Sequence, residues 1–147
     1  MFPLFLFLNK LFMKISEKIP SSLERIPSFI STIIERIRPL GIPEEEIFNI
    51  RLSLEEALVN AVKYGNKLDP QLTVEVKVQL DSDKLVIEVK DQGEGFDFEK
   101  LEDPTKEENI EKVRGRGIFL MKNLMDEVIF KEKGSRVIMI KFLRREA

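Results

Sequence analysis

The chain contains no cysteine, no histidine and no tryptophan among its 147 residues. The absence of cysteine excludes disulfides, thiol catalysis and thiolate metal sites, and it suits a cytoplasmic protein. The absence of histidine excludes a Ser-His-Asp mechanism and a phosphohistidine formed on the chain itself, and it removes the commonest transition-metal ligand. Any chemistry must therefore rest on carboxylates, amides, Lys, Arg and the backbone.

The charge balance narrows the choice of partners. Lys and Arg number 24 against 26 Asp and Glu, which gives a formal net charge of -2. A chain without a broad basic surface is a poor candidate for direct contact with nucleic acid or with an anionic membrane. With 43% hydrophobic and 34% charged residues, the composition predicts one compact domain with one core.

The N-terminus is an apolar run, MFPLFLFLNKLF, which is too short to cross a membrane. It has neither the preceding basic segment nor the following small-residue cleavage site of a signal peptide. We therefore expect residues 1–12 to be an apolar tail or the product of an over-extended start, with Met13 as a second possible start. Residues 13–147 are expected to form a single domain.

The first half of that domain shows mainly helical periodicity. Residues 15–19 alternate weakly and could form an edge strand. Apolar residues then recur at helical spacing from Ser21 to Ile37, with Pro27 as a possible start or kink. A second helix is expected from about Pro43 to Tyr64, ending at Gly65 and Asn66.

The second half predicts strands paired by short turns. Two hairpins are expected, with strands at 72–80 and 85–90 and at 127–131 and 136–143. Between them, residues 96–114 are polar without a firm period, which indicates a long loop of the kind that forms lids. A short helix is expected at 117–125. Helices and hairpins in separate blocks predict an α+β fold, a two-layer sandwich in which a mostly antiparallel, mixed sheet is covered on one face by helices.

Glu56 and Asn60 share one face of the second predicted helix, four residues apart. A carboxylate there could deprotonate an attacking hydroxyl, and the neighbouring amide oxygen is a hard ligand suited to Mg²⁺. The alternative is an ordinary solvated helix face, because Glu and Asn at this spacing are common.

Asp91 ends a predicted strand and is followed by Gly93 and Gly95. Glycines let the backbone approach a flat ligand closely, and the carboxylate could accept a hydrogen bond from an exocyclic amine such as that of adenine. The alternative is a glycine-rich turn with an exposed Asp.

Gly115 and Gly117 precede the short helix, whose free N–H groups and dipole favour a phosphate. Arg114 and Arg116 place positive charge at the end of the helix where cations are disfavoured unless an anion is bound. The alternative is a basic loop ended by glycine, which balances the acidic residues before it.

Three stretches occur in a meaningful order: EEALVNAVKYGN, DQGEGFD and RGRGIFLMKNLMDEV. They resemble the N, G1 and G2 boxes of the GHKL ATPase superfamily, and most closely those of the anti-sigma-factor serine kinases, the RsbW-like and SpoIIAB-like proteins. The resemblance extends from about Met13 to the C-terminus. It implies the two-layer ATPase sandwich of the GHKL (Bergerat) type, with a lid at about 96–114.

The resemblance also implies roles for the site residues. Glu56 matches the catalytic base and Asn60 the Mg²⁺ ligand, while Asp91 matches the adenine-binding aspartate. The glycines of the second and third stretches match positions that bind the nucleotide and its phosphates: Gly93, Gly95, Gly115 and Gly117. Arg114 or Arg116 would contact the γ-phosphate from the lid.

The implied activity is transfer of the γ-phosphoryl of ATP to a Ser or Thr of a STAS-type anti-sigma factor antagonist, by a cytoplasmic homodimer that also binds a sigma factor. ATP, ADP and Mg²⁺ are the implied ligands. The family often has His where this chain has Tyr64, which leaves a second interpretation open: an ATP-dependent anti-sigma binding module without phosphotransfer. A histidine-kinase catalytic domain acting on another chain is a third, weakened by the missing dimerisation helices.

Overall fold

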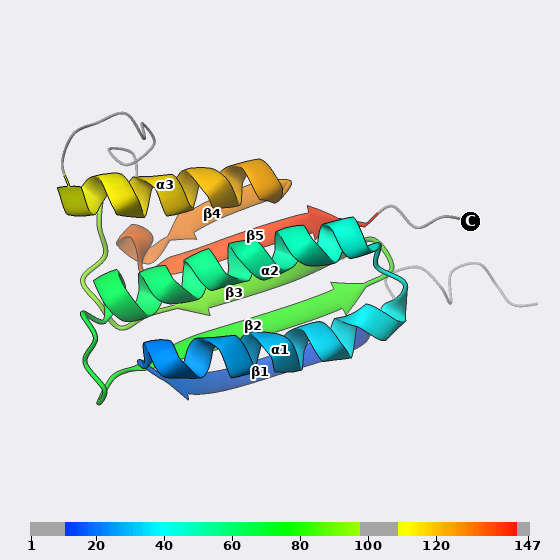
Figure 1. The fold of residues 1–147 in the computed structure, drawn as a ribbon, viewed down its shortest axis with the longest axis horizontal. Helices are drawn as coiled ribbons and strands as arrows, with labels where there is room; N and C mark the ends of the chain where they lie inside the picture. The colour runs from blue at the N-terminus through cyan, green and yellow to red at the C-terminus, as the bar shows by residue number, and fades with distance from the viewer. Residues whose placement is uncertain (1–10, 98–108, 144–147) are drawn as a thin grey trace, which may run out of the picture.

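Residues 11–97 and 109–143 are described by the computed structural model, and they form two layers. The helices are α1 (Ile26–Ile37), α2 (Glu44–Val59) and α3 (Asn109–Leu124). Figure 1 shows all three on the same face of a single sheet. The predicted α+β fold is thereby confirmed. No helix among the described residues is long and apolar enough to cross a bilayer.

The sheet has five strands in the order β1-β2-β3-β5-β4. Their bounds are β1 (Leu11–Pro20), β2 (Thr73–Asp81), β3 (Lys84–Lys90), β4 (Glu127–Lys131) and β5 (Arg136–Phe142). Every neighbouring pair is antiparallel, so the parallel pairing of a mixed sheet is not found among the described strands. Both predicted hairpins are present, and β1 lies at the edge as the weak alternation of residues 15–19 indicated.

Sequence signals explain where α1 and α2 begin. Pro27 lies in the first turn of α1, where its missing N–H is not needed, and a short 3₁₀ turn (η2, Leu23–Arg25) precedes it. Pro43 precedes α2, whose first turn carries Glu44, Glu45 and Glu46 at the positive end of the helix dipole.

The end of α2 differs from an ordinary helix end. The chain continues as one π-helical segment, η4 (Asn60–Gly65), and the N–H of Asn66 donates to the carbonyl of Ala61 at 2.8 Å. The helix thus extends to Gly65 as predicted, but its last turn is wider than an α-helical one. Such π turns are found frequently at functional sites.

The start of α3 contradicts the sequence-based expectation. The helix begins at Asn109 and not near Gly117, so residues 109–114 of the expected lid are helical. The stretch NIEKVRGRG has no proline and is rich in good helix formers, and these outweigh the two glycines that we took as the helix start. Residues 98–108 and the expected tail at 1–10 lie outside the described residues.

The core lies between the helices and one face of the sheet. Alternate strand residues such as Val76, Val78 and Ile87 are fully buried and meet the apolar stripes of the helices, including Ile50 and Leu54 of α2. The same packing fixes α2 over the centre of the sheet. Its C-terminal end therefore reaches the edge where β3 ends and α3 begins (Figure 1).

Candidate functional site

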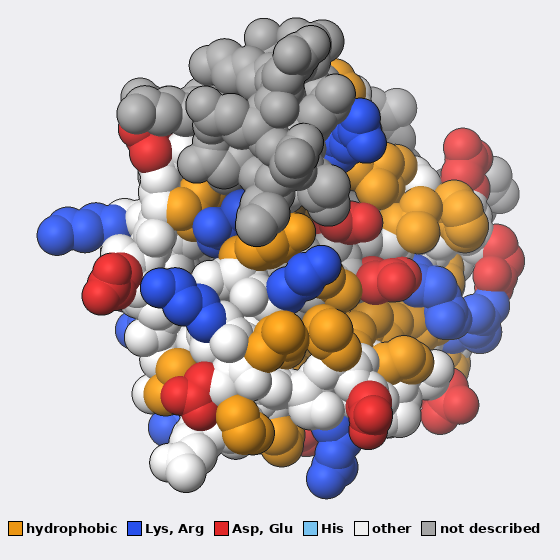
Figure 2. Space-filling view, turned by 60° about the vertical axis from the view of Figure 1, so that its left-hand side comes forward, with side chains coloured by type: hydrophobic (Ala, Val, Ile, Leu, Met, Phe, Trp, Pro, Cys, Tyr) orange, Lys and Arg blue, Asp and Glu red, His pale blue; other side chains and the backbone are white. Residues whose placement is uncertain are grey.

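Glu56 and Asn60 lie at the C-terminal end of α2, beside α3. Figure 2 views this end of the molecule, where acidic, basic and hydrophobic side chains are interspersed on the described surface. The pocket here is lined by residues of α2, η4 and α3: Glu56, Val59, Asn60, Lys63, Tyr64, Arg114, Gly117, Ile118 and Met121. The predicted helix carboxylate, amide and glycine therefore converge on one cavity.

Glu56 is half-buried against α3. A Cβ at Gly117 would overlap its Oε2, so the glycine is what allows the carboxylate to lie against the helix. Burial, with a smaller contribution from the neighbouring charge of Glu55, raises the pKa of Glu56 above its ordinary value. A carboxylate with a raised pKa is better suited to accept a proton near neutral pH.

Asn60 is held by Arg114. The Nε–H of Arg114 donates to the amide oxygen of Asn60 at 2.6 Å, across 54 positions of sequence. The guanidinium also lies 3.5 Å from the ring centroid of Phe96 and 5.2 Å from that of Tyr64. Such contacts with aromatic faces stabilise a cation. The amide oxygen that we predicted as a Mg²⁺ ligand is therefore hydrogen-bonded to Arg114.

Burial lowers the pKa of Arg114 to about 10, although electrostatic interactions with Asp91 and, to a smaller extent, Tyr64 oppose the change. A guanidinium with this pKa remains protonated at neutral pH. Arg114 consequently acts as a permanent positive charge in the pocket, which favours an anionic ligand if the side chain turns toward it.

Asp91 lies at the end of β3 and is 5% exposed. Its Oδ1 accepts the N–H of Gly93 at 2.8 Å, and a Cβ at Gly65 would overlap the carboxylate. Burial raises the pKa of Asp91, while the hydrogen bond from Gly93 and the charge of Arg114 partly offset that effect. The alternative of an exposed Asp in a glycine-rich turn is therefore wrong, since Asp91 is a buried and oriented carboxylate.

Gly93 and Gly95 have close backbone neighbours within the protein. A Cβ at Gly93 would overlap the carbonyl of Gly65, and one at Gly95, where φ is +87°, would overlap the carbonyl of Lys133. The N–H of Phe96 also donates to Lys133 at 2.9 Å. These glycines therefore fix the loop after Asp91 between η4 and the β4–β5 turn, a role that the sequence argument did not foresee.

The predicted phosphate-binding turn is not formed. Gly115 and Gly117 lie inside α3, where backbone N–H groups bond to carbonyls four residues earlier and are not free for a ligand. Gly115 is buried and Arg116 is exposed. The structure brings Arg114 and Gly117 to the pocket but leaves Arg116 on the surface.

The cavity at this site has a volume of about 70 Å³. Pockets that bind small molecules usually measure roughly 300–1,000 Å³, so the arrangement around Arg114 must open to admit a nucleotide. Among the described residues no cluster of three or more acidic side chains could cage a metal ion. A Mg²⁺ ion here would depend on Asn60 together with phosphates and water, which is how Mg²⁺ is commonly held.

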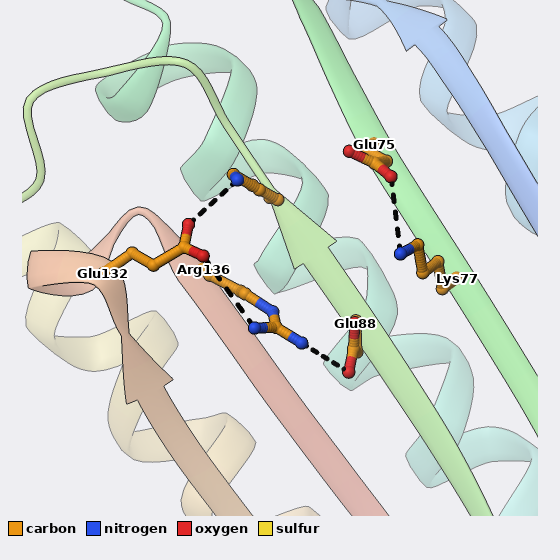
Figure 3. Close-up of a pocket in the computed structure, with 6 residues that line it drawn as sticks. Glu75, Lys77, Glu88, Glu132 and Arg136 are labelled. Carbon is orange, nitrogen blue, oxygen red and sulfur yellow. Dashed lines mark hydrogen bonds and ion pairs between the residues drawn. The ribbon is translucent and has the colours of Figure 1, made fainter.

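A larger hollow of about 290 Å³ lies on the sheet face opposite the helices (Figure 3). Its charged side chains pair with each other: Lys90 with Glu132 at 3.0 Å, Arg136 with Glu88 at 2.9 Å, and Lys77 with Glu75 at 3.6 Å. These side chains remain 24–49% exposed. Ion pairs in contact with solvent contribute little to stability, and the pairing leaves few charges for a ligand. The smaller cavity is lined by Glu56, whose pKa is raised, and is the better candidate.

Sequence reasoning missed Phe96 and Asn66. Phe96 stacks on Arg114 and packs edge-on against Phe130, with ring centroids 5.5 Å apart. Asn66 was interpreted only as a helix end, yet it is 2% exposed and hydrogen-bonded to three other segments. Its position two residues after Tyr64 gave no signal of contact with the loop after Asp91.

Comparison with known proteins assigns this chain to a family. The profile described as "Histidine kinase-like ATPase domain" matches residues 19–141. Serine-protein kinase RsbW of Staphylococcus aureus strain JH9 is 31% identical over 140 residues, which cover 90% of this chain and 88% of that protein. RsbW of Staphylococcus epidermidis matches with the same identity and coverage.

A solved structure supports the same fold. The RsbU and RsbW domains of Rv1364c from Mycobacterium tuberculosis match with a TM-score of 0.57 at 13% identity, covering 90% of this chain. This chain spans only 32% of that longer chain. The structural likeness therefore concerns the architecture of the sandwich.

Proposed function

We propose that this chain, which belongs to the histidine kinase-like ATPase family, is a serine/threonine protein kinase and anti-sigma factor. The proposal follows the similarity of the chain to the serine-protein kinases RsbW. Its substrate would be a Ser or Thr of a STAS-type anti-sigma factor antagonist. The observation that carries this proposal is the convergence of Glu56, Asn60 and Arg114 on one cavity beside the buried Asp91.

Glu56 is proposed as the general base. Its carboxylate accepts the proton of the attacking hydroxyl while that oxygen bonds to the γ-phosphorus. The bond from the γ-phosphorus to the β–γ bridging oxygen breaks, and ADP leaves. The raised pKa of Glu56 and its place beside Gly117 of α3 suit this role.

Asn60 is proposed as the protein ligand of Mg²⁺. Its amide oxygen is a hard donor that already lies opposite a positive charge, the guanidinium of Arg114. When bound, Mg²⁺ would neutralise charge on the phosphate oxygens. Arg114 would leave Asn60 and turn to the γ-phosphate, where it would stabilise the charge of the transition state.

Asp91 is proposed to accept a hydrogen bond from the 6-amino group of adenine. The N–H of Gly93 holds one carboxylate oxygen in place. Because Asp91 is buried, a hydrogen bond from the ligand to its carboxylate would be stronger than the same bond in water. Gly95, Gly115 and Gly117 would allow the backbone to approach the nucleotide, the latter two after α3 has rearranged.

The proposed partners are a sigma factor and the STAS-domain antagonist, bound by a cytoplasmic homodimer. The near-neutral formal charge of -2 gives no reason to add nucleic acid or an anionic membrane. ATP and ADP would influence which partner is bound. Only the ATP-bound chain carries a γ-phosphoryl that it can transfer to the antagonist.

Incubation of the purified chain with γ-labelled ATP, Mg²⁺ and a STAS-domain protein from the same organism tests the kinase. We expect acid-stable label on the STAS protein with wild type and almost none with Glu56→Ala. Absence of transfer by wild type, or equal transfer by the variant, would contradict the proposal. Acid-labile label would instead indicate a histidine kinase activity.

Tyr64 favours a second candidate, an ATP-dependent anti-sigma binding module without phosphotransfer. Its ring lies near the guanidinium of Arg114, at the position where the family often has His. In that case Asp91→Asn would abolish both ATP binding and partner switching, although no phosphoprotein forms. ATP-dependent binding of the sigma factor without any label on the STAS protein would identify this module, whereas the kinase also labels the STAS protein.

A further inference from the structure

Asn66 is a polar residue buried next to the proposed adenine site. It follows η4 directly and is 2% exposed, while its neighbour Ser21 is 3% exposed. A buried amide without partners would destabilise the fold, so its hydrogen bonds indicate what it is for.

Three other segments meet at this side chain. Its Nδ2 donates to the Oγ of Ser21 at 2.6 Å and to the carbonyl of Thr73 at 2.9 Å, and its Oδ1 accepts the N–H of Gln92 at 2.7 Å. The orientation follows from chemistry, because the Thr73 carbonyl can only accept and the Gln92 N–H can only donate. The amide therefore ties the end of η4 to the residue that follows Asp91.

The contact between η4 and this loop continues on both sides of the hydrogen bond. Gly65 lies against the carboxylate of Asp91, and Gly93 lies against the carbonyl of Gly65. The side chain of Gln92 accepts the N–H of Thr73 at 2.7 Å and so holds the loop to β2. Asp91 is thus flanked by a fixed backbone, with Asn66 bonded to its next residue.

We propose that Asn66 is a positioning residue for base recognition, and that it sets the preference of the site for a purine carrying a 6-amino group. The inference rests on the proposed function, because it takes Asp91 as the residue that accepts this amine. Through η4, Asn66 also fixes Asp91 relative to Asn60, so the base and the metal ligand keep a constant separation.

The test compares two ligands that differ only in the amine: ATP and purine riboside triphosphate, which lacks the 6-amino group. Calorimetric titration of the full chain gives the ratio of their dissociation constants. We expect wild type to prefer ATP and Asn66→Ala to bind ATP about tenfold more weakly, with the affinity for the analogue changed less than about twofold. Should the alanine variant not fold, Asn66→Ser gives the same test, since its shorter side chain does not reach Gln92.

Ser21→Ala is the matched control. It removes one hydrogen bond of the same buried network and leaves the bond to Gln92, so it should lower the melting temperature while the ligand ratio stays at the wild-type value. An unchanged ratio in Asn66→Ala or Asn66→Ser overturns the inference.

Asp91→Asn separates the two proposals: if it abolishes the ATP preference while the Asn66 variants keep it, only the role of Asn66 is wrong. If Asp91→Asn keeps the preference, the assignment of Asp91 fails and the inference fails with it.

Discussion

The two halves of the candidate site differ in how far they are formed. Around Asp91, hydrogen bonds and glycine contacts from η4, β2 and the β4–β5 turn fix the backbone. Around Gly117, the segment expected to cradle phosphates is helical, and Arg114 lines the cavity and is hydrogen-bonded to Asn60. We infer that the base half is preorganised and that the phosphate half must rearrange on binding.

The difference has a physical origin. Breaking the charged hydrogen bond between Arg114 and Asn60 costs about 1.5–3 kcal/mol before any ligand contact is made. Each glycine inside a helix weakens it by about 1 kcal/mol relative to alanine, which keeps this form of α3 easy to disrupt. Gly115 and Gly117 would therefore make the proposed rearrangement accessible, and the charge of a bound phosphate would offset its cost.

The largest predicted effect concerns the junction of the two halves. Glu56→Gln should lower phosphotransfer by roughly 10²- to 10⁴-fold, because the amide cannot accept the proton, while ATP affinity stays within about twofold. Single-turnover transfer and calorimetric titration measure the two quantities. Glu55→Gln, at the exposed neighbour, is the control. A loss of ATP affinity equal to the loss of transfer would place Glu56 in binding and not in catalysis.

Gly65→Ala should break the base half. The new Cβ would overlap the Asp91 carboxylate and displace it, so ATP affinity should fall roughly 100-fold. Gly41→Ala is the control. The backbone of Gly41 has a φ of +84°, which an alanine adopts only with strain, but no atom lies within 4 Å of the added Cβ. It should reduce stability alone. Retained ATP affinity in Gly65→Ala would mean that the base half is not preorganised.

Arg114→Ala should open the phosphate half. Without the contact to Asn60, ADP should bind several-fold more tightly, while phosphotransfer falls because the γ-phosphate loses a cation. Arg116→Ala, at an exposed position, should leave ADP affinity unchanged. Titration with ADP and transfer assays on both variants check this. The opposite pattern, with Arg116 controlling ADP affinity, would contradict the assignment.

The smallest effect is on stability. The pKa of Glu56 is raised in the folded state, so the folded chain holds this proton more tightly than the unfolded chain. Stability from Glu56 is present below its ordinary value of 4.5 and is lost as pH rises through the raised value. At pH 7.5, Glu56→Gln should raise the melting temperature by about 1–2 °C, a small change because the group is half-exposed. At pH 4 the two melting temperatures should coincide, and a lower value for the variant at pH 7.5 would reverse the sign.

The sequence predicted the sheet better than the site. The alternation of apolar and polar residues identified the hairpin of β2 and β3, because a half-buried strand needs that pattern. The strand-like segments at 127–131 and 136–143 identified the second hairpin. Proline and glycine marked the limits of α1 and α2. The predicted start of α3 was wrong. We placed the helix boundary at two glycines, but the good helix formers around them continue the helix.

The site residues were found one by one, but their contacts were not. Arg114 meets Asn60 across 54 positions, and Gly65 meets Asp91 only because η4 and β3 end at the same edge. No local pattern encodes such pairs, since the tertiary packing of α2 on the sheet creates them. The sequence also gave no indication that Arg114 would line the cavity and bond to Asn60.

Titration of the isotope-labelled chain with ATP and Mg²⁺, followed by amide chemical shifts, tests the central claim most directly. We predict the largest shifts at Gly93, Asn60 and Gly117, with only the α3 positions showing loss of helical structure. The amide shifts of residues that line the larger hollow on the opposite sheet face, such as Lys77 and Arg136, should not change. Shifts confined to that hollow, or none at Asn60 and Gly93, would contradict a nucleotide site between α2, α3 and the end of β3.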